Sequence, residues 1–243
     1  MPERIDLSAV YVEDYYESFR ATHGIVGGDQ AVSAFLASRL LRIEAQVGVG
    51  HLVDLGCAEG HFVAHARSRG WNAVGVEPSQ WAARAARRRY GVTVFNSDLA
   101  DAPIEPGSVD VIHANHVIEH LVDPIGTLRV ARRLLRRGGL LVLEVPYELR
   151  APLADRLFQL AKRQPQAPAE SSYHLFFFSP RGLQLAVEGA GFEAVKMSTV
   201  RYSPPPESRL PFGAHAKRAL FAIERRLMAG PNLEVVAAAT GRQ

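Results

Sequence analysis

The feature that most constrains the fold is a regular alternation of short apolar stretches with longer helix-forming stretches, beginning at His51. Strands that alternate with helices of ten or more residues form right-handed βαβ units, in which helices cover both faces of a parallel sheet. The predicted fold class is therefore α/β with a doubly wound, mostly parallel sheet. The expected strands are 51–55, 72–76, 92–95, 109–113 and 139–145, and the expected helices are 60–69, 79–89 and 123–136.

Both ends of the chain depart from this alternation. Residues 1–50 predict a helical N-terminal cap, with a helix around 30–47, and residues 51–243 predict the main domain. Near the C-terminus, 191–200 and 232–240 have strand patterns and are separated by the Pro-rich stretch 203–206 and a helix near 214–228. We expect these two strands to form an antiparallel hairpin that completes a seven-stranded sheet. Insertions are expected near 147–172 and 201–230.

Composition limits the classes of protein that are compatible with this chain. Its 243 residues are 47% hydrophobic and 22% charged, which is typical of one globular domain with room for insertions. The single cysteine, Cys57, cannot form an internal disulfide, and neither a signal-peptide pattern nor a run of about 20 apolar residues is present. We therefore expect a cytoplasmic protein without a membrane span.

The net charge of +3 comes with two arginine clusters in helix-forming stretches. Neither cluster is interleaved with aromatic residues, so solvated helix faces are favoured over a nucleic-acid surface. The clusters consist of Arg84, Arg87, Arg88 and Arg89, and of Arg132, Arg133, Arg136 and Arg137.

The stretch from His51 to Phe62 predicts a strand that breaks at Gly56 and passes through a tight turn into a helix near Gly60. Small residues at Gly56, Ala58 and Gly60 allow the backbone to approach a ligand closely, and amides at a helix start can hold its polar end. Taken alone, the pattern is equally compatible with an ordinary strand-to-helix turn.

Acidic residues follow the next two strands. Glu77 lies about twenty residues beyond the glycine turn, where an acid accepts hydrogen bonds from ribose hydroxyls in nucleotide-binding folds. Its other interpretation is an exposed acid that caps the next helix. Asp98 is placed either to bind an amino group of a base or to form an Asx turn. The matched spacing of the turn and Glu77 favours a nucleoside ligand.

The densest polar cluster is the segment HANHVIEHL, at the end of the fourth strand. If a helix begins near Asn115, His116, Glu119 and His120 stand at positions i, i+3 and i+4 on one face. This spacing suits chelation of a metal ion, and it also suits a general base beside a reacting centre. A polar helix start with backbone-bonded histidines remains the third interpretation.

A second histidine segment follows the insertion at 147–172, which is expected to lie over the strand ends. The segment YHLFFFSP contains His174 and three adjacent phenylalanines, which we expect to be buried between layers. Ser179 and Pro180 then predict the N-cap and first residue of a helix.

From about His51 to the C-terminus, the chain resembles the class I S-adenosylmethionine-dependent methyltransferases. Asp54 and the small residues at Gly56, Ala58 and Gly60 match the family's first motif, with Ala58 in place of the usual middle glycine, which is tolerable at a negative φ. The resemblance implies that Glu77 binds the ribose and that Asp98 and Leu99 contact the adenine. It also implies that the last strand lies between the fifth and sixth strands. The implied cofactor site comprises Asp54, Gly56, Cys57, Ala58, Gly60, Glu77, Pro78, Asp98, Leu99 and Asn115.

Within that family, the chain is most similar to the ubiquinone-biosynthesis type of O-methyltransferase and its small-molecule relatives. Some members and the small-RNA 2′-O-methyltransferases use a Glu-x-x-Glu-His sequence and a later histidine to bind a divalent cation. The matching residues here are His116, Glu119, His120 and His174. Histidine in place of the first glutamate favours zinc or iron over magnesium if a cation binds, and it is equally compatible with a histidine base and no metal.

The predicted function is therefore O-methylation of a small-molecule hydroxyl in biosynthesis, with S-adenosylmethionine as methyl donor and S-adenosylhomocysteine as product. His116, Glu119 and His120 are the predicted catalytic residues. Four alternatives remain: N- or carboxyl-methylation, RNA 2′-O-methylation, a nicotinamide-dependent oxidoreductase, and a non-catalytic cofactor-binding protein. The oxidoreductase fingerprint is weakened by His61 at its third-glycine position.

Overall fold

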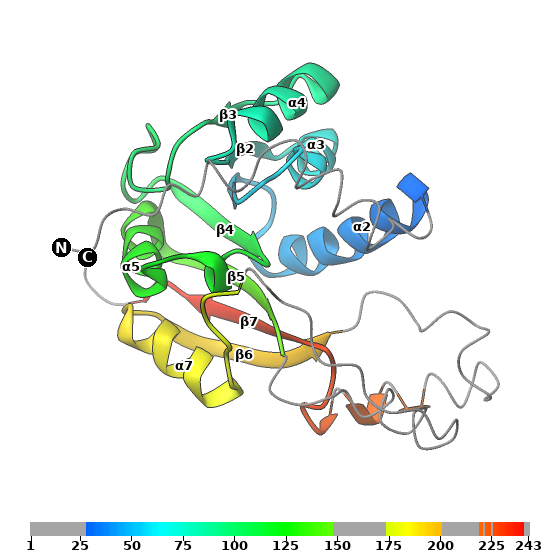
Figure 1. Cartoon of the computed structure of the whole chain (residues 1–243), viewed down its shortest axis with the longest axis vertical. Helices are drawn as coiled ribbons and strands as arrows, with labels where there is room; N and C mark the ends of the chain where they lie inside the picture. Colours follow the sequence, from blue (N-terminus) through cyan, green and yellow to red (C-terminus); the bar gives the residue numbers. More distant parts are fainter. Residues whose placement is uncertain (1–27, 148–173, 201–218, 221, 225, 241–243) are drawn as a thin grey trace.

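The computed structural model describes residues 28–147, 174–200, 219–220, 222–224 and 226–240 (Figure 1). Within them, seven strands form one sheet in the order β3-β2-β1-β4-β5-β7-β6. The strands are β1 (His51–Leu55), β2 (Asn72–Val76), β3 (Val94–Phe95), β4 (Val109–Asn115), β5 (Leu135–Pro146), β6 (Glu193–Val200) and β7 (Asn232–Ala238).

The sheet has the mixed topology that was predicted. β1 to β5 run parallel to their neighbours, whereas β7 pairs antiparallel with both β5 and β6. The last strand therefore lies between the fifth and sixth strands. These findings confirm the α/β fold class, the seven strands and the C-terminal antiparallel pair.

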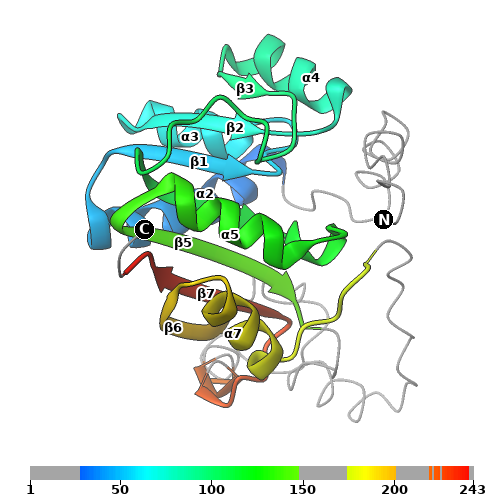
Figure 2. The same cartoon turned by 90° about the vertical axis from the view of Figure 1, so that its left-hand side faces the viewer.

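Helices cover both faces of the sheet (Figures 1 and 2). One apolar core lies between the sheet and the helices α2 (Gly28–Val47), α3 (His61–Ser68) and α4 (Gln80–Tyr90). A second core lies between the opposite face and the helices α5 (Pro124–Leu134) and α7 (Pro180–Gly189). β1 and β4 are the central strands and are buried on both faces, including their polar residues Asp54 and His113.

The helix starts follow the capping residues seen in the sequence. Asp123 caps α5 by accepting a hydrogen bond from Gly126 N at 2.8 Å, and Ser179 caps α7 by accepting one from Gly182 N at 3.0 Å. In both helices proline occupies the first turn, where a backbone N–H has no acceptor within the helix, so the missing N–H of proline loses no helical hydrogen bond.

Helix α2 is joined to the main fold by packing and by an ion pair. Leu40 and Ile43 are buried in the core beneath α3. Glu44 accepts hydrogen bonds from Arg69 at 2.6 and 2.8 Å and from Trp71 Nε1 at 3.1 Å.

Residues 1–27 of the predicted cap lie outside the described residues, as do 148–173 and 201–218 of the predicted insertions. Among the described residues, no helix combines the length and apolar character that crossing a membrane requires.

Close packing between β2 and the glycine turn gives a stability prediction. A Cβ at Gly75 would lie 2.3 Å from Cys57 Sγ and 3.3 Å from Val94 Cγ2. We expect Gly75→Ala to lower the free energy of unfolding by about 1–3 kcal/mol through overpacking. Urea denaturation followed by circular dichroism measures this change.

Two further variants test the cause. Gly189→Ala is the matched control, because no heavy atom lies within 4 Å of the added Cβ and alanine favours a helix. Combining Gly75→Ala with Cys57→Ala should recover part of the loss, since the nearest clashing atom is removed. Equal effects of the Gly75 and Gly189 substitutions would contradict the prediction.

Candidate active site

The glycine turn at the end of β1 has a left-handed backbone at three positions. Gly56, Ala58 and Gly60 have φ values of 66°, 46° and 78°. The negative φ at which alanine would be tolerated in this position is therefore not adopted. The left-handed conformation is unfavourable for alanine, but it directs the Ala58 amide to Glu77 Oε2 at 2.9 Å.

Glu77 connects this turn to the second strand. Its carboxylate accepts hydrogen bonds from Ala58 N and Ser79 N, each at 2.9 Å, and the residue is buried. The alternative of an exposed acid is thus wrong, although the bond to Ser79 does lie at the start of α4. A carboxylate offers about four lone-pair sites, so this geometry is compatible with ribose hydroxyls as further donors.

The other predicted cofactor residues occupy different environments. Asp98 is exposed, whereas Leu99 is buried in the core on the α5 face. Cys57 is buried beside Gly75, and burial raises the pKa of its thiol well above the usual value. Asn96 fixes the backbone next to Glu77 by donating to the carbonyls of Glu77 and Pro78 at 2.9 and 2.8 Å.

The segment after β4 does not form a helix beginning near Asn115, which was the condition for the i, i+3, i+4 arrangement. β4 continues to Asn115, His116 adopts a φ of 54°, and a short 3-10 helix, η2, spans Ile118–His120. The parallel pairing of Asn115 with Glu144 on β5 explains the difference, because sheet hydrogen bonds extend the strand. The predicted i, i+3, i+4 face is replaced by a tight turn.

This turn nevertheless brings the predicted polar residues together. His116 Nδ1 lies 3.4 Å from Glu119 Oε1, and His120 Nε2 lies 3.9 Å from the same oxygen. Glu119 is fully buried, and neither of its carboxylate oxygens makes a hydrogen bond with the described part of the chain. Burial of an ionised carboxylate is costly unless it is paired or binds a metal.

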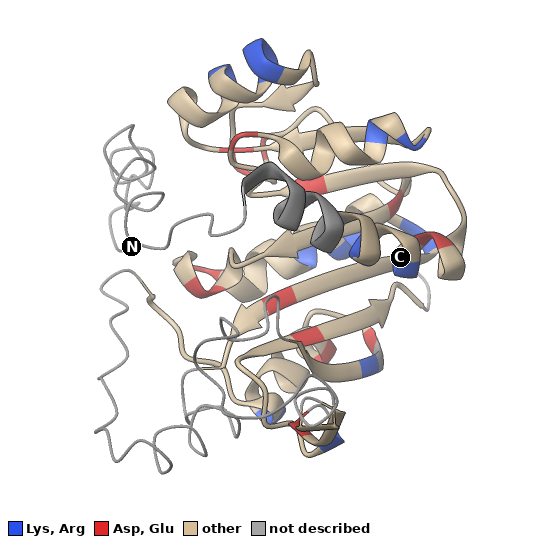
Figure 3. Ribbon diagram, turned by 90° about the vertical axis from the view of Figure 1, so that its right-hand side faces the viewer, with Lys and Arg blue, Asp and Glu red and all other residues tan. Residues whose placement is uncertain are grey.

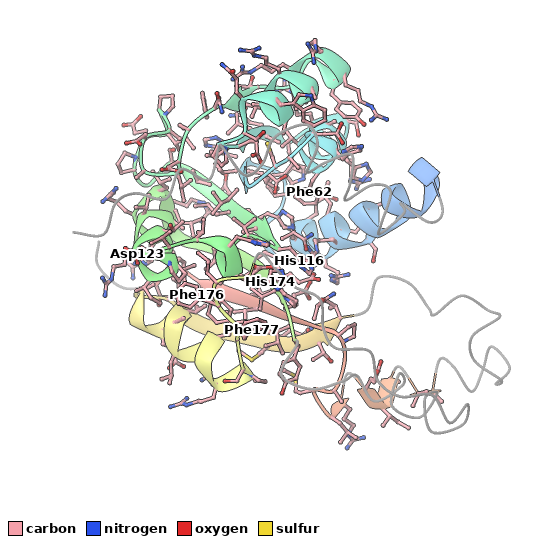
Figure 4. All side chains as sticks on the ribbon, viewed as in Figure 1. Phe62, His116, Asp123, His174, Phe176 and Phe177 are labelled. Carbon is pink, nitrogen blue, oxygen red and sulfur yellow. The ribbon has the colours of Figure 1, made fainter. Side chains whose placement is uncertain are left out.

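His174 reaches this cluster through the backbone of the residues that follow it. Leu175 N and Phe176 N both donate to the carbonyl oxygen of Glu119, at 2.8 and 3.0 Å. The rings of His120 and His174 meet edge to face, with their centroids 4.7 Å apart. Figure 4 shows His116 and His174 projecting from the loop after β4 and from the segment before α7.

Three of the four residues predicted to bind a metal converge. Ligand atoms of Glu119, His120 and His174 all lie within 4.8 Å of one another. His116 is not part of this group. Two nitrogen donors and a buried carboxylate whose oxygens lack hydrogen bonds fit a divalent cation of the zinc or iron type.

The phenylalanine segment is only partly buried. Phe178 is 9% exposed, but Phe176 and Phe177 are 39% and 52% exposed. The expectation that all three lie between layers was therefore wrong. The two backbone bonds to Glu119 hold this stretch at the edge of the fold, where only Phe178 reaches the core on the α5 face.

Sequence reasoning missed a buried polar layer beneath α2. It consists of Arg39, Asp54, His113, Glu144 and Glu234. A signal was present, since Glu144 and Glu234 interrupt otherwise apolar strands. Only the strand pairing, in which Glu144 lies directly opposite both Asn115 and Glu234, shows that these residues are neighbours.

The cluster after β4 lies directly against the glycine turn. A Cβ at Gly56 would lie 2.5 Å from Val117 Cγ2. The turn, Glu77 and the cluster therefore share the carboxyl edge of the parallel strands, which is where ligands bind in open α/β sheets.

Comparison with known proteins agrees with this architecture. A family model described as a methyltransferase domain matches residues 29–197. The chain is 28% identical over 165 residues to a ubiquinone biosynthesis O-methyltransferase of Cupriavidus pinatubonensis, covering 63% of this chain and 64% of that protein. It is 33% identical over 96 residues to a Mycobacterium tuberculosis protein named as a probable S-adenosylmethionine-dependent methyltransferase, covering 39% of this chain and 35% of that protein.

The chain thus spans less than two thirds of the length of each of these curated relatives. Among solved structures, a SAM-dependent methyltransferase from Thermotoga maritima has a TM-score of 0.60 at 20% identity, covering 97% of this chain and 98% of that one. This likeness shows the fold. The match to the family model across more than half of the sequence shows that the chain belongs to the class I S-adenosylmethionine-dependent methyltransferases.

Proposed function

We propose that this protein transfers a methyl group from S-adenosylmethionine to a hydroxyl oxygen of a small molecule. The observation that carries the proposal is the buried Glu119 carboxylate, whose oxygens lack hydrogen bonds among the described residues and are flanked by His116 and His120. The likeness to a ubiquinone biosynthesis O-methyltransferase supports oxygen as the acceptor atom.

The glycine turn and the following acids are the residues that would hold the cofactor. The backbone would approach the ligand closely at the small residues Gly56, Ala58 and Gly60, and Glu77 would accept hydrogen bonds from the ribose. Asp98 and Leu99 would face the adenine. When bound, the cofactor supplies a sulfonium-activated methyl group, so the protein's task is to align the acceptor and accept its proton.

The acceptor hydroxyl would be bound beside His120, with Glu119 orienting the imidazole. In one version His120 accepts the hydroxyl proton directly. In the other version, Glu119, His120 and His174 hold a divalent cation, which would polarise the hydroxyl oxygen. His116 is one-third exposed and would contact the acceptor from the turn after β4.

Incubation with radiolabelled S-adenosylmethionine tests the proposal. The acceptor panel contains phenols, catechols and aliphatic alcohols, with matched amines and carboxylic acids. We expect label transfer to a hydroxyl compound, and label only in an amine, a carboxylate or added RNA would contradict oxygen methylation of a small molecule. Exhaustive chelation then distinguishes the two versions. Activity that survives chelation excludes the divalent cation and retains His120 as the base.

A further inference from the structure

The buried polar layer lies on the sheet face that α2 covers. Asp54 and His113 are paired neighbours on β1 and β4, and Glu144 and Glu234 are paired neighbours on β5 and β7. Figure 3 shows acidic residues in strands of the sheet, with basic residues nearby. The layer therefore extends across four strands, at the edge that holds the predicted site.

Arg39 is the centre of this layer. Its Nη1 lies 3.0 Å from His113 Nε2 and donates to Asn115 Oδ1 at 2.9 Å. Its Nη2 forms an ion pair with Glu144 Oε2 and lies 3.4 Å from Glu234 Oε2. Burial lowers the pKa of Arg39 to about 10, so the guanidinium remains charged at neutral pH.

The contact with Arg39 determines the tautomer of His113. A guanidinium only donates hydrogen bonds, so His113 Nε2 must accept, and the ring proton must lie on Nδ1. Nδ1 in turn lies 2.6 Å from Asp54 Oδ1. Burial lowers the pKa of His113, in agreement with a neutral ring, and Phe62 stacks on this ring at 4.0 Å. Arg39 thereby orients Asp54, the acid that precedes the glycine turn.

On its other side, the layer reaches the predicted acceptor site through Glu144. Glu144 Oε1 lies 3.5 Å from His116 Nε2, and His116 N donates to the Glu144 carbonyl oxygen at 2.9 Å. Because Glu119 lies 3.4 Å from the opposite ring nitrogen, two buried carboxylates bracket the His116 imidazole. The orientation of this ring thus depends on both acids.

Stability alone does not explain such a layer. A buried ion cluster is commonly no more stable than apolar side chains of similar volume, because desolvation offsets the attraction between the charges. Here Arg39 is buried with three carboxylates, of which Glu234 also pairs with Arg42 at 3.0 Å. The advantage of the layer is instead geometric, because the Arg39 guanidinium fixes the positions of side chains on four strands.

We propose that Arg39 and Glu144 are positioning residues for methyl transfer. Glu144 orients His116 at the acceptor, and Arg39 orients Glu144 and, through His113, Asp54 beside the cofactor turn. Helix α2 then contributes to the site through Arg39, in addition to packing on one face of the sheet. The inference rests on the proposed function, because His116 must face the acceptor.

Kinetics on four variants tests the proposal. Glu144→Gln keeps the shape of the side chain and removes its charge, and Arg39→Met removes the guanidinium. For both we expect kcat to fall about tenfold or more. Affinity for S-adenosylhomocysteine by calorimetry should stay within about threefold in Glu144→Gln, whereas Arg39→Met, which also releases Asp54, should weaken it further. Arg39→Lys should recover part of kcat. Arg42→Met is the matched control on the same helix, since the Arg42 side chain is 47% exposed, and it should leave kcat unchanged.

Nitrogen-15 NMR of the histidine rings gives a readout that does not require an acceptor. We expect Arg39→Met to abolish the fixed Nδ1–H tautomer of His113, and Glu144→Gln to shift the His116 signals, with no change in Arg42→Met. Unchanged kcat in folded Glu144→Gln, or unchanged His116 signals, would overturn the inference. If Arg39→Met does not fold, Glu144→Gln decides the question. Wild-type protein that methylates no hydroxyl compound, but shows these NMR effects, would instead refute the proposed function.

Discussion

Replacement of Glu119 with glutamine is expected to lower kcat for methyl transfer by about 100-fold. The substitution preserves the shape of the side chain but removes the charge that orients His120 or would bind a cation. Affinity for S-adenosylhomocysteine should stay within about twofold, because Glu119 belongs to the cluster proposed to bind the acceptor and not to the glycine turn. Single-turnover kinetics and calorimetry measure the two quantities.

The same substitution should stabilise the fold. A buried carboxylate without hydrogen bonds imposes a desolvation cost, and a neutral amide at this position reduces it, so we expect the melting temperature to rise while activity falls. Glu105→Gln, at an exposed acid, is the control that should change neither quantity. A Glu119→Gln protein with wild-type kcat would remove Glu119 from the mechanism.

Replacement of Glu77 with alanine is expected to weaken S-adenosylhomocysteine binding by about 100-fold. The hydrogen bond from Ala58 N to the charged Glu77 carboxylate, worth about 1.5–3 kcal/mol, holds the glycine turn against the end of β2, and a second bond from Ser79 N fixes the carboxylate at the start of α4. Their loss releases Ala58 from its left-handed conformation and removes the predicted ribose acceptor. Isothermal calorimetry measures the dissociation constant.

Glu77→Gln separates the two contributions, because it keeps one acceptor oxygen and removes the charge. Its affinity should fall between those of the wild type and Glu77→Ala, and its kcat at saturating cofactor should stay near the wild-type value. A folded Glu77→Ala protein that binds the cofactor with unchanged affinity would refute the role of Glu77 in cofactor binding.

Much of the site could be anticipated, because the sequence pattern predicts where the parallel strands end and the site lies at those ends. Glu77 and the cluster around Glu119 follow strands of a parallel sheet, and all such ends meet at one edge. The geometry within the cluster could not be anticipated in the same way. The pairing of Asn115 with Glu144 extends β4, and a left-handed residue and one 3-10 turn follow it in place of a helix that begins near Asn115.

The sequence by itself determined the alternation of strands and helices, the C-terminal pair of strands and the identity of the polar residues at the strand ends. These features depend on local periodicity and on short-range capping. The position of the last strand beside β5 followed only from the resemblance to the methyltransferase family, because strand order is not encoded in a local pattern. Only the tertiary structure decided that the backbone after His174 docks on Glu119, and that Arg39 joins Asp54, His113 and Glu144. The direct contacts among these residues link positions 56 to 105 apart, and the packing of α2 and of the segment after His174 against the sheet, rather than any local pattern, brings them together.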